Sequence, residues 1–511
     1  MIVEDQAETI AFLKAAVGIH DAARADESFE THVSFVFLAG DLAYKLKRAV
    51  RYDYLDFSTA EKRAAAAAAE LALNRRTAPS LYLEARDIRR QSSGRLGFGG
   101  DGPLVDSVIV MRRFDQDCLL DRMARRGALT PGLMRDLADE IIAFHDSAEV
   151  DRCFGGHAGL AAFIDGNEAN LALAVPAIFD AGSVEQLTGA TRAALGEVRE
   201  LVEARRLADK VRLCHGDLHL RNIVLLDGAP TLFDCIEFSR SIACVDVLYD
   251  LSFLLMDLAH RGLGDLASTV FNRYFDLSGE VEGAGALPLF LSIHAAIRAH
   301  VSAAAVLAGK PDDKRAGAVA EARAYAVLAE ALLRSEKPRL IAIGGLSGTG
   351  KSTLACGLAP RIAGTPGARV LRSDVLRKRL AGARPETPLP PEAYGEAAAH
   401  AVYARLGDEA GRLLRSGRSV ILDAVFLRAE ERAAARALAA DLEVDFQGFW
   451  LEAPAEILAA RLEARRGDAS DATVEVLHRQ LAMSAGPVDW VRLDAAGDTA
   501  AVLAAIIKMT H

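Results

Sequence analysis

One stretch of this chain, from Gly345 to Thr353, fits the phosphate-binding pattern G-x-x-x-x-G-K-[ST], the P-loop. Residues 339–344 before it are apolar and β-branched, as a buried parallel strand should be, and residues 354–359 look like the start of a helix. In that setting, backbone N–H groups and the helix N-terminus point at an anion. We therefore predict that nucleotide phosphates bind Gly345, Ser347, Gly348, Thr349, Gly350, Lys351, Ser352 and Thr353.

Two side chains of the motif carry specific chemistry. Lys351 supplies a positive charge for the outer phosphates, and the Ser352 hydroxyl is a ligand for Mg²⁺. The alternative is a chance glycine turn, which the strand before and the helix after make less attractive.

The position of the P-loop implies at least one other domain before it. The loop's strand begins near residue 338 of 511, which leaves too many residues for a tail. Residues 334–338 are charged and end in proline, as a linker does. We predict two domains, residues 1–335 and 336–511.

Composition narrows the class of protein. The chain is 51% hydrophobic and 25% charged, with a net charge of −10, which argues against a general nucleic-acid or membrane-surface binder. Six cysteines without a C-x-x-C pair and an acidic N-terminus without a signal-peptide pattern favour a cytoplasmic protein. The most apolar span, residues 286–309, contains His294, Arg298 and His300, so we expect a buried helix and no membrane span.

The first hundred or so residues predict a mostly antiparallel sheet with one long helix. A short helix over residues 5–20 comes first, and two β-rich runs around the turn at residues 39–41 then form a hairpin, whose second strand carries Lys45 and Lys47 on one face. A helix over residues 60–76 carries Glu70. Two more strands, 81–88 and 107–111, flank a glycine-rich loop near 94–103, and residues 116–210 are almost entirely helical in pattern. The two lysines could equally belong to a solvated edge strand.

A second chemical stretch begins at His215-Gly216-Asp217, with Asn222 five residues after the aspartate and Asp234 on a following strand. This pattern resembles the catalytic loop of the protein-kinase-like fold, and most closely its aminoglycoside phosphotransferase and choline kinase branch. By itself, His-Gly-Asp could be a turn with a capping aspartate. The resemblance covers about residues 25–330 and implies an N-lobe at about 25–113 and a helical C-lobe at about 114–335.

The resemblance implies roles for single residues. Asp217 would accept the proton of the substrate hydroxyl, and Asn222 and Asp234 would hold metal ions that bridge the phosphates of ATP. Lys45, tied by Glu70, would hold the α- and β-phosphates; Lys47 and Glu61 are the other choices for these two positions. The hairpin has no G-x-G-x-x-G pattern to cover the phosphates. We expect His219 to be a solvated loop residue, and Asp246 and Asp250 to be structural.

The second domain adds further polar residues to the P-loop. A strand over residues 368–372 delivers Asp374 and Arg377, and Arg418 to Asp423 forms an apolar strand that ends in an aspartate able to hold Mg²⁺. The order of these elements resembles the zeta-toxin, gluconate kinase and polynucleotide kinase group. The resemblance implies Asp374 as the base, Arg377 as an acceptor-binding residue, and Arg461 and Arg465 as lid arginines that bind nucleotide. These basic residues could also simply solvate helices.

These patterns together predict a two-domain α/β protein. It would combine a protein-kinase-like α+β bilobal domain with a three-layer P-loop domain built on a parallel sheet. The whole chain resembles bacterial proteins that join an aminoglycoside-phosphotransferase-like domain to an AAA-type or zeta-toxin-like ATP-binding domain. The resemblance implies a phosphotransferase that is active in both halves and uses ATP and Mg²⁺ on small-molecule hydroxyl acceptors. From the net charge we expect no nucleic acid or membrane as partner. The alternatives are a regulatory or toxin-like protein in which one domain senses nucleotide and gates the other, and, less favoured, a mechanical ATPase.

Overall fold

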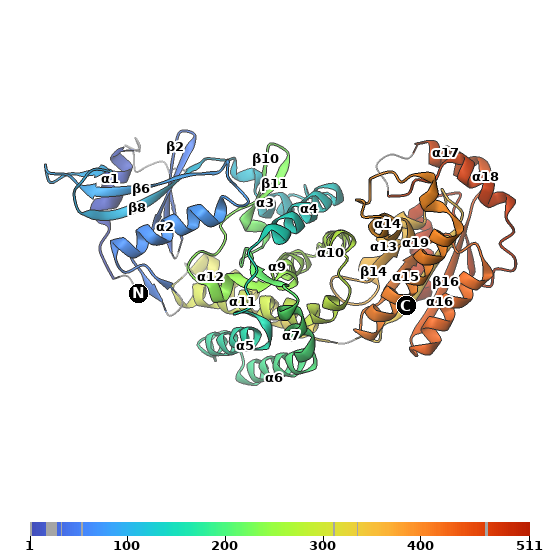
Figure 1. The fold of residues 1–511 in the computed structure, drawn as a ribbon. Helices are drawn as coiled ribbons and strands as arrows, with labels where there is room; N and C mark the ends of the chain where they lie inside the picture. Colours follow the sequence, from blue (N-terminus) through green and yellow to red (C-terminus); the bar gives the residue numbers. More distant parts are fainter. Residues whose placement is uncertain are drawn as a thin grey trace. The chain divides into compact units, whose positions relative to one another are not determined.

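The computed structural model describes residues 3–16, 28–31, 33–52, 55–309, 312–334, 336–464 and 469–510 (Figure 1). It divides into two compact units: unit 1 holds Met1–Gly159 and Arg206–Leu251, and unit 2 holds Leu160–Arg205 and Ser252–His511. This division groups segments by compactness and does not test the domain limits 1–335 and 336–511, which stay a prediction.

Unit 1 is built on a six-stranded antiparallel sheet with the strand order β1-β2-β3-β8-β6-β7. Lys45 of β3 lies between Val36 of β2 and Ile109 of β8, so the predicted hairpin strand is central and not a solvated edge. The strands are β1 (Ser28–Glu30), β2 (Ser34–Ala39), β3 (Leu42–Lys47), β6 (Tyr82–Arg90), β7 (Leu96–Phe98) and β8 (Leu104–Arg112).

One helix covers each face of this sheet (Figure 1). Helix α2 (Ala60–Asn74) starts at Thr59, whose side chain accepts the Lys62 N–H and so caps the helix. It packs on the face that holds Ala43 and Ile109, and α1 (Ala7–Ala16) packs on the face that holds Tyr44 and Leu46. Because side chains alternate along a strand, Lys45 and Lys47 share the α2 face with Ala43.

The glycine-rich region near residues 94–103 is not only a loop, as the sequence led us to expect. It contains strand β7, which pairs with β6. The Phe98 ring lies edge-on to the Phe12 ring of α1, with centroids 5.2 Å apart. The packing of this partly buried aromatic pair outweighs the low strand preference of the neighbouring glycines.

The rest of unit 1 is helical, with short strand pairs that carry the His-Gly-Asp region. β9 pairs with β12, β10 pairs with β11, and β4 pairs with β5, all antiparallel. The elements are β4 (Arg51–Tyr52), β5 (Leu55–Asp56), η1 (Gln116–Cys118), α3 (Leu120–Arg125), α4 (Pro131–Ser147), β9 (Val211–Leu213), η2 (Leu220–Asn222), β10 (Ile223–Leu226), β11 (Ala229–Leu232), α8 (Arg240–Ala243) and β12 (Cys244–Asp246).

Three helices continue from one unit into the other: α5 (Gly156–Ala172), α7 (Arg199–Leu207) and α9 (Val247–His260). The helices of unit 2 before its sheet are α6 (Ala181–Glu197), α10 (Gly264–Ser278), η3 (Glu282–Ala286), α11 (Leu287–Leu307) and α12 (Asp312–Leu332).

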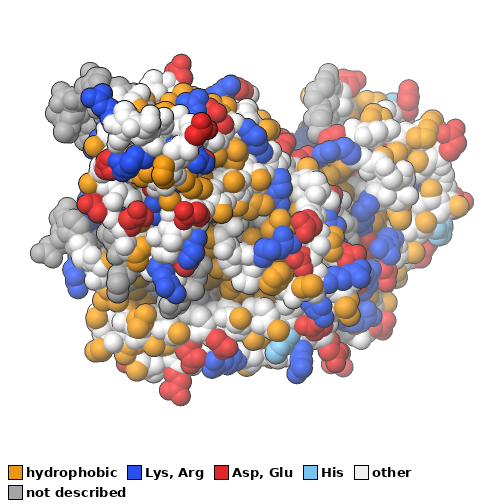
Figure 2. All heavy atoms as spheres, turned by 60° about the vertical axis from the view of Figure 1, so that its left-hand side comes forward, with side chains coloured by type: hydrophobic (Ala, Val, Ile, Leu, Met, Phe, Trp, Pro, Cys, Tyr) orange, Lys and Arg blue, Asp and Glu red, His pale blue; other side chains and the backbone are white. Residues whose placement is uncertain are grey.

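The segment Glu282–Leu307 is long and apolar enough to cross a membrane, but 67% of its most apolar window is buried inside the protein. A core helix has the same composition, and this burial agrees with the expectation of a buried helix. On the face shown in Figure 2, acidic and basic side chains lie interspersed among apolar ones.

The C-terminal sheet of unit 2 has five parallel strands in the order β14-β15-β13-β16-β17. Helices α13 and α19 pack against one face through Leu354 and Ile506, and α15 and α16 contact strands β15 and β16 (Figure 1). The predicted three-layer P-loop architecture is confirmed. The strands are β13 (Arg339–Gly345), β14 (Arg369–Arg372), β15 (Val420–Asp423), β16 (Asp445–Glu452) and β17 (Val491–Asp494).

The helices of this region follow the strands in alternation, as right-handed β-α-β units require. They are α13 (Lys351–Leu358), η4 (Ala359–Arg361), α14 (Ser373–Leu380), η5 (Pro391–Tyr394), α15 (Glu396–Arg415), α16 (Ala429–Asp441), α17 (Ala455–Ala464), α18 (Val474–Ala482) and α19 (Thr499–Thr510).

Edge strand β14 is covered by α10 of the same unit. Asn272 Oδ1 accepts the Val370 N–H at 2.8 Å, and its Nδ2 donates to Ala368 O at 3.3 Å, so one amide satisfies two backbone groups of the edge. Arg369, which is 2% exposed, donates to Asn272 Oδ1 at 3.0 Å and pairs with Asp276 at 2.5 Å. The strand that leads into Asp374 is therefore fixed from outside the sheet.

The close packing of β16 against Trp490 gives a test of this sheet. A Cβ at Gly448 would lie 2.5 Å from the indole ring, whereas a Cβ at Gly407 on α15 meets nothing within 4 Å. We expect Gly448→Ala to destabilise the sheet by about 1–3 kcal/mol through overpacking. Gly407→Ala, the matched control, should stabilise it by up to about 1 kcal/mol through helix propensity.

The chain's two tryptophans, Trp450 and Trp490, both lie at this sheet, so tryptophan fluorescence during urea unfolding reports on it selectively. Equal unfolding midpoints for the two glycine variants would contradict the packing described here.

Candidate functional site

The α2 face of the N-terminal sheet carries a buried cluster of lysines and carboxylates. Lys45 Nζ lies 2.7 Å from Glu70 Oε1 and 2.5 Å from Asp234 Oδ1. Lys47 Nζ pairs with the other Glu70 oxygen and lies 2.5 Å from Glu237 Oε1. The structure thus brings both candidate lysines onto Glu70, which is fully buried, and Lys45 is the one that also reaches Asp234.

Charge pairing outweighs burial at Lys45 and Asp234. Burial alone would lower the pKa of Lys45, but Asp234, Glu70 and Glu237 outweigh it and raise that pKa. Burial works to raise the pKa of Asp234, and Lys45 holds the pKa below its ordinary value. The Asp234 side chain is still 41% exposed, so a cation could reach its carboxylate.

One amide side chain that the sequence reasoning missed fixes Glu70 relative to Asp234. Asn74 Oδ1 accepts the Cys235 N–H at 2.8 Å, and Asn74 Nδ2 donates to Glu70 O at 2.9 Å. Asn74 is fully buried on the same face of α2 as Glu70, four residues later. In the sequence, Asn74 is marked only by its position, as a polar residue four places after Glu70.

The His-Gly-Asp loop lies in the same unit and holds Asp217 by its neighbours. Asn222 Nδ2 donates to Asp217 Oδ2 at 2.8 Å and to Asp217 O at 3.0 Å. Phe233 N–H donates to Asn222 O at 3.0 Å, which links this loop directly to the residue before Asp234. Asn222 keeps its side-chain oxygen as a potential metal ligand.

Asp250 anchors the loop from beneath. Its carboxylate accepts the backbone N–H of His215 at 3.2 Å and of Gly216 at 2.8 Å, and it lies 3.1 Å from His145 Nε2. Gly216 has a φ of +80°, which favours glycine at this turn. The Asp246 carboxylate accepts the Leu248 N–H at 2.8 Å, as a residue at the start of a helix does.

The P-loop of unit 2 is a glycine cradle. Gly345, Gly348 and Gly350 have φ values of +138°, +90° and +87°. A Cβ at Gly348 would lie 2.8 Å from Leu458 O, so a side chain there does not fit. The Thr349 hydroxyl donates to Leu346 O at 2.8 Å, and Lys351 Nζ donates to the same carbonyl at 2.9 Å, which holds the amine over the loop.

The predicted metal ligands of unit 2 meet at the end of the sheet. Ser352 Oγ donates to Asp423 Oδ2 at 2.6 Å, and Arg372 Nε lies 3.5 Å from the same oxygen. Burial raises the pKa of Asp423, against the opposing charges of Arg372 and Lys351. A hydroxyl and a carboxylate oxygen side by side next to a phosphate cradle suit Mg²⁺, so these residues fit Mg²⁺ and a nucleotide.

The predicted acceptor residues occupy the same edge of the sheet. Asp374 lies in the first turn of α14, two residues after Arg372, whose register partner is Asp423. Arg377 Nη1 donates to Ala393 O at 2.9 Å, and its guanidinium lies over the Tyr394 ring at 5.0 Å.

Asp471, which the sequence reasoning missed, ties this region to the segment before α18. It accepts from Lys378 Nζ at 2.6 Å, from the Leu389 N–H at 3.1 Å and from the Tyr394 hydroxyl.

The structure describes only one of the two predicted lid arginines. Arg461 donates to the carbonyls of Ala495 at 2.8 Å and Ala496 at 3.1 Å, just after β17 on the ligand edge of the sheet. Arg465 lies outside the described residues. Thr353 is the third residue of α13. The nucleotide-binding roles of these three stay predictions.

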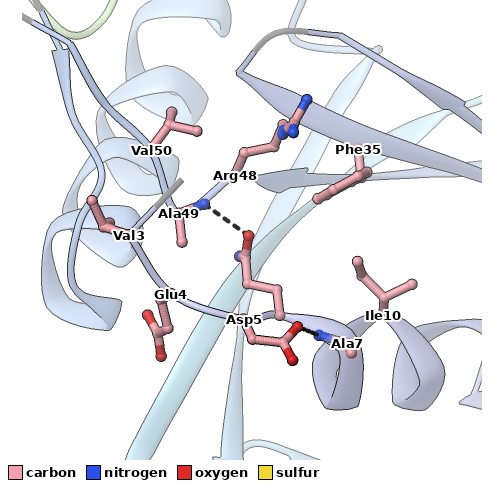
Figure 3. Close-up of a pocket in the computed structure, with 10 residues that line it drawn as sticks. Val3, Glu4, Asp5, Ala7, Ile10, Phe35, Arg48, Ala49 and Val50 are labelled. Carbon is pink, nitrogen blue, oxygen red and sulfur yellow. Dashed lines mark hydrogen bonds between the residues drawn. The ribbon is translucent and has the colours of Figure 1, made fainter. Parts of the chain in front are cut away.

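A cavity of about 560 Å³ lies away from these residues, under the N-terminal segment of unit 1 (Figure 3). Gln6 ties this segment to the sheet, because its side chain accepts the Ala49 N–H at 2.7 Å and donates to Lys47 O at 2.9 Å. None of the predicted site residues lines the cavity, which is formed by residues 3–7, Ile10, Phe35 and residues 48–50.

Comparisons with known proteins match both halves of the chain. The family described as "Phosphotransferase enzyme family" matches residues 108–286, and the family described as "AAA domain" matches residues 340–487. Uncharacterized protein Rv2004c of Mycobacterium tuberculosis and uncharacterized protein Mb2027c of Mycobacterium bovis are each 33% identical to the chain over 498 residues, which cover 92% of it and 93% of each relative. The chain belongs to their family. The prediction of a phosphotransferase-like part followed by a P-loop part is confirmed.

Solved structures resemble single parts of the chain. A choline/ethanolamine kinase family protein from Mesorhizobium loti is 18% identical with a TM-score of 0.37, covering 64% of this chain and 98% of its own. A gluconokinase from Sinorhizobium meliloti 1021 is 23% identical with a TM-score of 0.24, covering 34% and 97%. No substrate of this chain follows from those names.

The buried Glu70 cluster gives a second prediction. Lys47→Met leaves Glu70 and Glu237 without their shared cation, which we expect to lower the free energy of unfolding of unit 1 by about 3–5 kcal/mol. Hydrogen exchange of peptides from β3 and α2 would then accelerate.

Lys62→Met is the matched control, because the pair of Lys62 with Asp56 lies at the surface and contributes little. Equal exchange rates in the two variants would contradict the importance of the buried pairing.

Proposed function

We propose that this chain is an ATP-dependent phosphotransferase with two nucleotide sites, each transferring the γ-phosphoryl group to a hydroxyl of a small molecule. One observation supports this most. In a single unit, the contacts of Lys45 join Glu70 to Asp234, and one backbone hydrogen bond joins the segment of Asp234 to the Asp217–Asn222 pair. Phosphoryl transfer needs this set of positioned charges more than it needs covalent chemistry.

Each residue of unit 1 has a role in this proposal. Bound Mg²⁺ would neutralise the charge of the phosphates, held by Asp234 and by the side-chain oxygen of Asn222. Lys45 would turn from Asp234 to the phosphates while Glu70 keeps it in place. Asp217 would orient the acceptor hydroxyl and take its proton, since its carboxylate is 37% exposed while its backbone is fixed.

In the P-loop domain the same task would fall to a different set. The glycine cradle and Lys351 would hold the phosphates, and Ser352 and Asp423 would hold Mg²⁺. Asp374 would act on the acceptor hydroxyl. Arg377 contacts a carbonyl and an aromatic ring, which are uncharged. Because these contacts leave the positive charge of the guanidinium in place, Arg377 favours an anionic acceptor.

One set of contacts favours a second candidate function, in which one domain gates the other. Asn272, Arg369 and Asp276 bind α10 to β14, the strand that leads directly into Asp374. A shift of α10 would therefore move the acceptor side of the P-loop site, so that helix could report on nucleotide elsewhere in the chain.

The test is ADP release from Mg·ATP with a panel of alcohols: sugars, aminoglycosides, choline, nucleosides and sugar nucleotides. We expect Asp217→Asn and Lys351→Ala each to lower turnover at least about 100-fold with a different acceptor. Exposed residues give matched controls, Asp136→Asn on α4 and Lys508→Ala on α19, which should keep wild-type rates.

The outcomes separate the two candidates. Loss of different acceptors in the two variants supports two kinase sites. If one variant changes ATP binding but no transfer reaction, the domain that carries the substitution is a sensor. The gating function then replaces the proposal of two kinase sites. Full turnover with every acceptor in both variants would refute the proposal.

A further inference from the structure

His219 is not the solvated loop residue that the sequence led us to expect. Its side chain is 8% exposed, and the residue is the N-cap of the η2 turn that ends at Asn222. Its Nε2 lies 3.4 Å from Asp217 Oδ1. A buried imidazole beside the acidic group of the proposed site needs an explanation.

The hydrogen bonds of the ring define where its proton lies. Nδ1 accepts the Arg221 N–H at 3.3 Å, so this nitrogen carries no hydrogen. In a neutral imidazole the hydrogen is then on Nε2, the atom that faces Asp217. His215 has the same arrangement, because its Nδ1 accepts the Asp217 N–H at 3.3 Å and its Nε2 lies 2.9 Å from Phe233 O.

Asp217 thus has a polar neighbour at each carboxylate oxygen. Asn222 Nδ2 donates to Oδ2 at 2.8 Å, and His219 Nε2 faces Oδ1. With a donor at each oxygen, the plane of the carboxylate would be fixed, while the exposed part of the side chain could still meet a hydroxyl. A base fixed in this way loses little freedom when the acceptor binds.

We propose that His219 is a positioning residue for phosphoryl transfer, which as neutral imidazole donates its Nε2–H to Asp217 and holds that carboxylate toward the acceptor hydroxyl. This rests on the proposed function of unit 1. His219 acts through Asp217 and does not itself touch the reacting atoms. A substituted side chain at position 219 that can still donate a hydrogen bond should therefore preserve the function of His219.

The first test is nuclear magnetic resonance of the full chain with ¹⁵N-labelled histidine rings. Among the 12 histidines, the His219 signals are those lost in His219→Gln. We expect the Nε2–H tautomer, and a change of its proton shift in Asp217→Asn, where the acceptor is neutral. His478→Gln, at an exposed position of α18, should leave these signals unchanged. An Nδ1–H tautomer, or no response to Asp217→Asn, would overturn the proposal.

The second test is kinetic, with Lys351→Ala as background so that the P-loop site is silent. The probe is ADP release from Mg·ATP with water as acceptor, repeated with any alcohol the panel identifies. We expect His219→Leu to lower kcat about 10- to 100-fold with the KM for ATP within about twofold. His219→Gln should recover most of the rate, because its amide can donate.

The possible failures are distinguishable. If Asp217→Asn abolishes turnover but His219→Leu does not, or if Gln is as impaired as Leu, the positioning role falls and the proposed function stands. If Asp217→Asn keeps full turnover in this background, both fall together. If the background protein releases no ADP with water or with any alcohol of the panel, the proposed function of unit 1 falls and the positioning role falls with it.

Discussion

Glu70 is the residue on which the organisation of unit 1 depends. A fully buried carboxylate is tolerated only when cations meet it, and here β3 supplies two, Lys45 and Lys47. These lysines reach on to Asp234 and Glu237, so β3, α2 and the segment after β11 must lie together for any of the charges to be stable. Assembly of the site and folding of this part of the chain are thus the same event.

The P-loop region obeys a different constraint, the direction of its strands. Because all five strands are parallel, the residues that follow them collect at one edge, where the glycine cradle, Asp423 and Asp374 meet. The contacts of the glycine cradle at this edge depend on backbone geometry. The candidate site of the P-loop region is formed by the strand topology, whereas the candidate site of unit 1 is formed by paired charges.

This difference explains how well each site could be predicted from the sequence. The P-loop, Asp423 and Asp374 follow from local patterns next to strands, and the structure places them together. In unit 1 the strand positions of Lys45 and Lys47 were predictable, but not that both would bind Glu70, since this depends on how α2 packs. Asn74, Asp471, the pairing of Glu237 with Lys47 and the burial of His219 were missed, because each partner lies far away along the chain or in a turn whose geometry the sequence does not encode. Strand β7 was missed because the aromatic pair that stabilises it spans Phe12 and Phe98.

The two kinds of site also differ in what ligand binding must change. In unit 1, Lys45 pairs with Asp234, so in the proposed function a nucleotide with its metal separates this ion pair, while Lys47 keeps its contact with Glu70. Two lysines on one glutamate make this exchange possible without leaving a buried charge alone. In the P-loop region, Lys351 donates to the backbone carbonyl of Leu346, and its charge acts on Asp423. In the proposed function, the second lysine therefore leaves Glu70 paired when Lys45 turns to the phosphates.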